Sequence, residues 1–218
     1  IDTVSTRICQ NSKGLITASV SNVRSNDSWT LTYNVGTSTG LTYSNVGPGT
    51  FNITTPTLSN PGYVNVKLTF IKNNTTTCDS TLNTQFDSIF VDATTDPGFI
   101  IGDTTVCNGS NSGVVTQTSG NGSIIRWEYS QDNGSTWTTI SNTASTYTYS
   151  NLTKTTLFRS IRRNGTCSEA TQSTPVKITI RELPVATISG SQTICSGQTA
   201  ALTVSASNTY SEGWNVVY

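Results

Sequence analysis

The sequence predicts an all-β protein built from tandem sandwich domains, and three observations lead to this prediction. The first is composition: only 11% of the 218 residues are charged, 12 of each sign, and uncharged Thr, Ser and Asn abound. Such short polar side chains compete with the helical backbone for hydrogen bonds, whereas Thr suits a pleated surface. The second observation is a series of short apolar runs with a period of two residues, and the third is an internal repeat of cysteine and tryptophan.

The alternating runs follow one another along the chain with turn residues between them. Those before residue 97 are "LITASV", "WTLTYNV", "GTFNITT", "YVNVKLTFI" and "FDSIFVDA"; those after it are "GVVTQT", "IIRWEYS", "TWTTI", "STYTYS", "TLFRSIRR" and "PVKITI". No segment shows a sustained period of 3.6 residues. About seven short strands in about 90 residues is typical of an immunoglobulin-like β-sandwich. We therefore expect tandem immunoglobulin-like domains, the last one incomplete.

The internal repeat is marked by three cysteines that each follow a β-branched residue and precede a polar turn, namely Cys9, Cys107 and Cys195. They lie 98 and 88 residues apart, and a tryptophan follows them at distances of 20, 20 and 19 residues: Trp29, Trp127 and Trp214. A fixed period of this kind indicates serial structural units. We expect these three tryptophans to lie in the cores of successive domains.

The other two cysteines, Cys78 and Cys167, occur in Thr-rich turns late in the first two repeats. Each full repeat thus reads Cys, Trp, Cys, which predicts disulfides Cys9–Cys78 and Cys107–Cys167 and an oxidising, extracytoplasmic location. Loops this long, once closed, stabilise a domain by about 4 kcal/mol on the chain-entropy model. Cys195 is left unpaired because we expect the third repeat to be cut off after its tryptophan. The alternative is that all five cysteines are buried free thiols.

Domain boundaries are expected at Pro97 and Pro184, each of which follows the last strand of a repeat. Proline cannot extend the preceding ladder and limits how the chain pivots. The expected domains are 1–96, 97–183 and an N-terminal part of a third, 184–218. The opening "IDTVSTRIC" has no signal-peptide pattern, and we expect an internal piece of a longer protein.

Several function classes are disfavoured by composition. The chain has no His, which removes the usual general base and most zinc sites, and its carboxylates are scattered. We therefore expect no catalytic residues, no metal site and no cofactor. The balanced charge leaves no basic patch for nucleic acid. No apolar run approaches the roughly 18 residues of a membrane span.

The stretch "SQDNGSTW" has the spacing of an Asp-box, formed by Ser130, Asp132, Gly134, Thr136 and Trp137. Alternating runs flank it, and an Asn-Gly pair favours a hairpin because both residues accept positive φ. Asp132 and Thr136 can hydrogen-bond the backbone of their own turn. A sialidase would need several copies in a propeller, so we interpret this copy as a folding element. Calcium held by Asp132 and neighbouring oxygens is the alternative.

The second repeat, from "VCNGSNSGVVT" through "WEYSQDNGSTWTTISNTASTYTYSNLTKTTLFRSIRRNGTCSEATQSTPVKITI", resembles the immunoglobulin-like repeats of very large Bacteroidetes surface proteins. These include gliding-motility adhesins exported by the type IX secretion system. The start of the third repeat resembles them well, and the first repeat, which lacks the Asp-box hairpin, less closely. The resemblance implies a secreted, non-catalytic stalk or adhesive module at the cell surface. Its implied partners are further repeats, an outer-membrane anchoring or secretion partner, and a surface polysaccharide or other extracellular ligand.

Two further expectations concern carbohydrate. Proteins of that phylum carry O-glycans at Asp-Ser/Thr motifs, and the acceptors matching this pattern are Thr3, Ser80, Ser88 and Thr104. The alternative function is a carbohydrate-binding module of a secreted multidomain hydrolase, in which exposed aromatics stack on sugars. The residues that would do so are Tyr33, Tyr43, Tyr147 and Tyr149, unless their side of the strand is the core.

Overall fold

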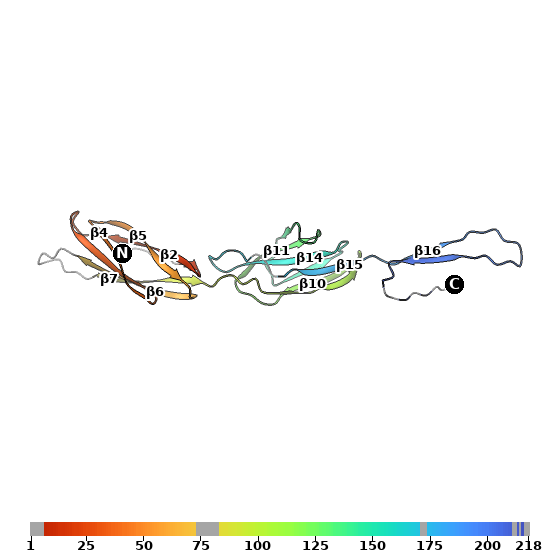
Figure 1. The fold of residues 1–218 in the computed structure, drawn as a ribbon, viewed down its shortest axis with the longest axis horizontal. Helices are drawn as coiled ribbons and strands as arrows, with labels where there is room; N and C mark the ends of the chain where they lie inside the picture. The colour runs from red at the N-terminus through yellow and green to blue at the C-terminus, as the bar shows by residue number, and fades with distance from the viewer. Residues whose placement is uncertain (1–6, 73–82, 171–173, 211–212, 214, 216–218) are drawn as a thin grey trace. The chain divides into compact units, whose positions relative to one another are not determined.

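The computed structural model describes residues 7–72, 83–170, 174–210, 213 and 215. Every regular element in these ranges is a β-strand (Figure 1), so the predicted all-β class is confirmed. The described residues divide into two compact units. Unit 1 contains residues 1–97 together with 120–123 and 162–171, and unit 2 contains 98–119, 124–161 and 172–218.

Unit 1 contains a sandwich of two sheets. One sheet has the order β1-β7-β6-β3-β4 and the other pairs β2 with β5. The first strand, β1, runs parallel to the last, β7, while the other pairs are antiparallel. The strands are β1 (Arg7–Cys9), β2 (Ser12–Val20), β3 (Ser28–Val35), β4 (Ser38–Val46), β5 (Gly49–Leu58), β6 (Gly62–Lys72) and β7 (Asn83–Asp92).

The core of this sandwich forms around Trp29, which is 0% exposed. Its indole Nε1 donates a hydrogen bond to the Gly47 carbonyl oxygen (2.8 Å), so the one polar atom of the ring is satisfied. Alternate residues of both sheets form one core cluster with it, including Ile16 from β2, Ile53 from β5 and Ile89 from β7. The period-two pattern of the sequence therefore places its apolar half between the sheets.

Unit 2 repeats this topology. One sheet has the order β12-β11-β14-β15-β9, with β9 parallel to the last strand β15, and the other has the order β13-β10-β8. A first strand shared between two sheets and parallel to the last is consistent with an immunoglobulin-like arrangement. The strands are β8 (Ile100–Ile101), β9 (Thr104–Cys107), β10 (Ser112–Gln117), β11 (Ser123–Ser130), β12 (Thr138–Ile140), β13 (Thr146–Ser150), β14 (Thr156–Arg163) and β15 (Val176–Arg181).

Trp127 occupies the corresponding core position and is also 0% exposed. Its Nε1 donates to the Ala144 carbonyl oxygen (2.9 Å). Gly113 lies opposite Tyr149 in the β10–β13 ladder, and a Cβ at residue 113 would overlap the Tyr149 ring, so glycine makes room for a buried tyrosine. The two sandwiches thus have the same kind of tryptophan-centred core.

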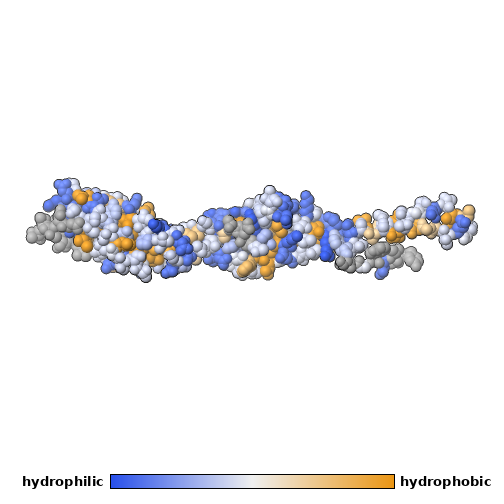
Figure 2. All heavy atoms as spheres, in the orientation of Figure 1, coloured by the Kyte–Doolittle hydropathy of each residue, from blue (hydrophilic) through white to orange (hydrophobic). Residues whose placement is uncertain are grey.

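After Pro184 the structure describes one hairpin, β16 (Val185–Ser189) paired with β17 (Thr203–Ser207). Its residues are largely exposed, and Trp214 lies outside the described residues. The described part of the chain contains no helix long and apolar enough to cross a membrane. On the face shown in Figure 2, hydrophobic residues are interspersed with hydrophilic ones.

Candidate functional sites: a disulfide-bonded turn and an exposed aromatic patch

The cysteine pairing differs from the prediction. Cys9 is bonded to Cys167, 158 residues later, with a Cα–Cα distance of 4.8 Å. The predicted pairs Cys9–Cys78 and Cys107–Cys167 are therefore wrong. Cys107 and Cys195 are free and exposed, which also excludes the alternative of five buried thiols, and Cys78 lies outside the described residues.

Strand direction explains why a repeat does not close on itself. β9 runs parallel to β15, and Cys107 is level with Arg181 at the end of β15, whereas Cys167 precedes the start of β15 at Val176. Five residues of strand cover about 17 Å, and a disulfide tolerates Cα atoms no more than about 7 Å apart. In unit 1, Cys9 is likewise level with Asp92, at the opposite end of β7 from Asn83.

Cys167 ends the tight turn Asn164–Cys167, which we call the cysteine turn. Its amide donates to the Asn164 carbonyl oxygen (2.9 Å), and Gly165 has φ of 53°. The turn binds the segment that follows β7: Asn164 Nδ2 donates to the Ala93 carbonyl oxygen (2.8 Å), and the Asn164 amide donates to Thr95 Oγ1 (3.0 Å). Ala93 and Thr95 both belong to unit 1. The disulfide is therefore accompanied by hydrogen bonds between the cysteine turn and the segment that follows β7.

Asp92 is the electrostatic centre of this contact. Its side chain is 2% exposed and forms an ion pair with Arg7 (2.6 Å), while Oδ2 accepts hydrogen bonds from the Thr166 amide (2.8 Å) and Oγ1 (3.0 Å). The hydrogen bonds from Arg7 lower the pKa of Asp92 to about 2; burial opposes this shift and Thr166 adds to it. A charged, hydrogen-bonded carboxylate therefore lies beside the disulfide.

The Asp-box forms a compact hairpin turn between β11 and β12. Asn133 and Gly134 have φ of 58° and 89°, the positive values that both residue types accept, within the seven-residue connection 131–137. Asp132 Oδ1 accepts from Ser130 Oγ (2.7 Å) and from the Thr136 amide (2.9 Å), and Oδ2 accepts from Thr136 Oγ1. Trp137 Nε1 donates to the Gly134 carbonyl oxygen (3.0 Å). Each residue of the motif therefore takes part in the turn.

This bonding occupies the Asp132 carboxylate. Hydrogen bonds from Thr136 first, and then from Ser130, lower the pKa of Asp132 to about 2, so the group is ionised at neutral pH and is a poor proton donor. A calcium ion here would have to displace these donors. No group of three or more Cys, Asp or Glu side chains placed to hold a metal occurs among the described residues.

The covering ring of Trp137 also connects to the sheet. The Arg159 guanidinium lies 3.8 Å from the Trp137 ring centre and pairs with Glu128 (2.6 Å), which Arg126 also contacts (2.7 Å). Burial raises the pKa of Glu128, but the two arginines outweigh this effect and the net shift is downward. The hairpin is thus held to the sheet by a charged network.

The four tyrosines considered for sugar stacking pack inwards. Tyr149 is 3% exposed and stacks on Phe158 with ring centres 5.9 Å apart, and Tyr147, Tyr33 and Tyr43 are partly buried against the two cores. Their side of the strands is therefore the core side.

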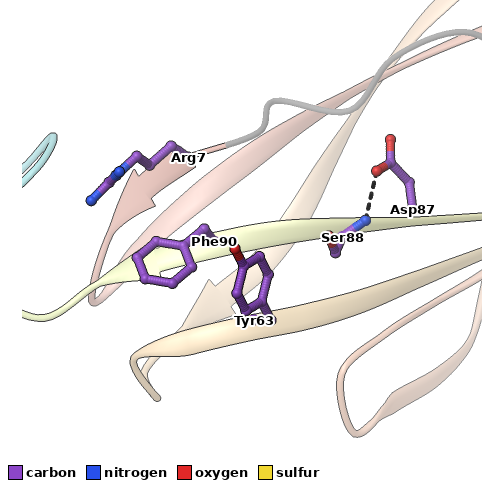
Figure 3. A pocket seen from close by; sticks show the side chains of 5 residues that line it. All are labelled: Arg7, Tyr63, Asp87, Ser88 and Phe90. Atoms are coloured by element: carbon purple, nitrogen blue, oxygen red, sulfur yellow. Dashed lines mark hydrogen bonds between the residues drawn. The ribbon is translucent and has the colours of Figure 1, made fainter.

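A different set of aromatics lies on the outer face of β6 and β7, and we call Tyr63, Phe86 and Phe90 the aromatic patch. Tyr63 is 77% and Phe86 73% exposed, and the Tyr63 and Phe90 rings meet edge to face at 4.9 Å. Tyr63 is paired with Phe90 and Lys67 with Phe86 in the ladder, so all four side chains share one face. Arg7 lies 4.9 Å from the Phe90 ring centre (Figure 3).

The patch borders a pocket lined by Arg7, Tyr63, Asp87, Ser88 and Phe90. Figure 3 shows these residues, with the Ser88 amide donating to Asp87 Oδ1 (2.7 Å). The exposure of Tyr63 could have been predicted from the alternating pattern. In "YVNVKLTFI" the buried residues are Val66 and Leu68, so Tyr63 lies on the polar side of the strand. Of the expected glycan acceptors, Ser88 lines this pocket and Thr104 is exposed in β9, while Thr3 and Ser80 lie outside the described residues.

Comparison with known proteins gives a family match for part of the chain. Residues 96–182 match a family described as a domain of unknown function, DUF8696. No curated protein matches the chain.

Solved structures to which this chain is similar include fibronectin(III)-like modules of Clostridium thermocellum CbhA, with 18% identity over 83% of this chain and 94% of that one and a TM-score of 0.39. Titin domains A168–A170 share 18% identity over 81% and 62%, with a TM-score of 0.47. Chicken CNTN1 domains FN1–FN3 share 12% over 82% and 63%, with a TM-score of 0.38. The chain thus spans about three-fifths of the latter two structures.

The strand orders of the two units define the class of this protein: a chain of immunoglobulin-like β-sandwich modules with a long-range disulfide.

Proposed function

We propose that this chain is a non-catalytic, load-bearing segment of a large cell-surface adhesin of the Bacteroidetes type, exported by type IX secretion and used in gliding or surface attachment. The observation that carries the proposal is the Cys9–Cys167 disulfide. Disulfides persist in oxidising compartments outside the cytoplasm, which supports an extracellular location. Partners would be further repeats, an outer-membrane anchor and a surface ligand.

The polar chemistry of the described residues supports a structural role. Asp132 and Glu128, the carboxylates of the hairpin and its network, are saturated by hydrogen bonds and arginines, and Asp92 is paired with Arg7. A general acid or nucleophile needs a reactive group facing a substrate. Each of these carboxylates instead contacts its own hydrogen-bond or ion-pair partners and stabilises the local structure.

The test uses cells that carry the gene. Surface-restricted biotinylation and disulfide mapping are expected to find the protein outside the cell with Cys9 bonded to Cys167, and deletion of the segment is expected to reduce attachment or gliding. A matched strain with Cys9→Ser, in which that bond cannot form, serves as the control for the disulfide mapping. A cytoplasmic protein with both cysteines reduced would overturn the proposal.

The aromatic patch favours a second candidate, carbohydrate binding. Exposed rings stack on the apolar faces of sugars, and the neighbouring Asn65, Lys67 and Asp87 are exposed polar groups on the same strands. A secreted module that binds a polysaccharide would serve either an adhesin or a hydrolase.

Binding is measured by affinity electrophoresis or a glycan array with the purified chain. Tyr63→Ala and Phe86→Ala are each expected to weaken binding about tenfold, the effect of roughly 1.4 kcal/mol of lost ring contact. Phe99→Ala is the matched control, because Phe99 is a 66% exposed aromatic in unit 2. Equal loss in all three variants, or no binding by the unmodified chain, would contradict this candidate.

A further inference from the structure

We infer that Cys107 is a second attachment point of the same kind as Cys9, and that it forms a disulfide with the cysteine turn of a further repeat of this type. The inference starts from the position of Cys9, which is the last paired residue of a strand parallel to the final strand of its sandwich. Cys107 has the same position: it ends β9 and is paired with Arg181 of β15.

The backbone around the two cysteines matches beyond the strand. The residue after Cys9, Gln10, donates its amide to the Asp92 carbonyl oxygen (2.7 Å), and Asn108 after Cys107 donates to Arg181 (2.8 Å). The next amides, of Asn11 and Gly109, donate to the carbonyl oxygens of Leu58 (2.8 Å) and Leu152 (3.3 Å).

Backbone conformation matches as well, because Asn11 and Gly109 both have positive φ, 63° and 91°. The chain therefore turns in the same way after both cysteines, and in unit 1 this site holds a cysteine turn. Cys107 is exposed and unbonded, so its thiol is accessible to the same partner.

The side chains that receive the turn differ between the two sites. Asp92, which accepts from Thr166, is replaced in unit 2 by Arg181, and Thr95 is replaced by Pro184. The cysteine thiol and the backbone carbonyl oxygens of the segment after the last strand are present at both sites. In the cysteine turn that contains Cys167, Thr166 donates hydrogen bonds to Asp92. A turn that binds at Cys107 is therefore expected to have a hydrogen-bond acceptor at the position of Thr166, facing Arg181.

Bond formation needs an oxidant, for which a small-molecule disulfide such as oxidised glutathione suffices. The Cys107 thiolate attacks this disulfide and releases one glutathione thiolate. The thiolate of the incoming turn then displaces the second glutathione, so two thiols lose two electrons and two protons in all. Overlapping loops of this kind would keep the string of domains covalently joined after a backbone cut within either loop.

The test extends the full chain. Residues 132–183 are copied after Tyr218, which corresponds to Gln131 when Trp214 is aligned with Trp127. The third repeat then continues with the later strands and the cysteine turn of the second. After refolding in a glutathione buffer, non-reducing peptide mapping is expected to find Cys107 bonded to the appended copy of Cys167. Cys9–Cys167 in the same molecule shows that the buffer is oxidising enough. In a control chain the appended copy of Cys167 is replaced by serine, and Cys107 is then expected to remain free for alkylation.

A second extended chain carries Arg181→Asp, which restores the acceptor for the threonine of the copied turn, and is expected to give a higher yield of the new bond. Cys107 that stays fully alkylatable in both chains while Cys9–Cys167 forms would overturn the inference. So would a bond from the appended cysteine to Cys195.

Discussion

Asp92 shows how a single carboxylate can make the disulfide contact depend on pH. Its pKa is held near 2, chiefly by Arg7, so the ionised form is favoured by folding. A group whose pKa is lowered on folding stabilises the protein above its unfolded pKa, near 4, and loses this contribution as the pH falls towards 2. Urea unfolding of the chain and of Asp92→Asn is therefore expected to differ at pH 6 and to converge between pH 4 and pH 2. A difference that stays constant over this range would contradict the assignment.

At the scale of structural elements, the cysteine turn depends on one glycine. Gly165 has positive φ, and a Cβ there would overlap the Asp92 carboxylate. Gly165→Ala is expected to cost about 1–2 kcal/mol for the left-handed backbone and in addition to lower the yield of Cys9–Cys167 on oxidative refolding.

The matched variant is Gly109→Ala, which has positive φ but no atom within 4 Å of the added Cβ. It is expected to show only the backbone cost, measured by urea unfolding, with a normal yield of the disulfide. Equal disulfide yields in the two variants would show that the overlap with Asp92 does not matter.

The strands themselves show what the alternation of apolar and polar residues can and cannot predict. Segments such as "WTLTYNV" and "YVNVKLTFI" form β3 and β6 as expected, because a period of two residues is a local property that fixes which side chains enter the core. Trp29 and Trp127 are buried for the same reason. The disulfide pairing depends instead on which end of a strand each cysteine occupies, and this follows from the parallel pairing of the first strand with the last, which no local pattern encodes.

The aromatic patch could be predicted from the sequence only in part. Tyr63 belongs to the polar half of β6, so its exposure follows from the pattern. Phe86 shares its side of β7 with Ser88 and Phe90, and alternation alone does not predict that this side is exposed. That the two exposed rings lie beside Phe90 and Lys67 follows only from the register of β6 with β7. A register between strands is set by the whole sandwich, and so the patch became visible with the structure.

At the scale of the whole molecule, the disulfide determines which part of the chain carries a mechanical load. Force applied at the two ends passes through the Cys9–Cys167 bond, so the residues between them are bypassed however they fold. Reduction is expected to lengthen the fully stretched chain by about 550 Å, since an extended residue spans roughly 3.5 Å and the bond closes 158 residues. Single-molecule force–extension curves with and without a thiol reductant measure this length. In Cys9→Ser the stretched length should be the long one in both conditions, and a reductant-independent length in the unmodified chain would mean that the bond does not carry the load.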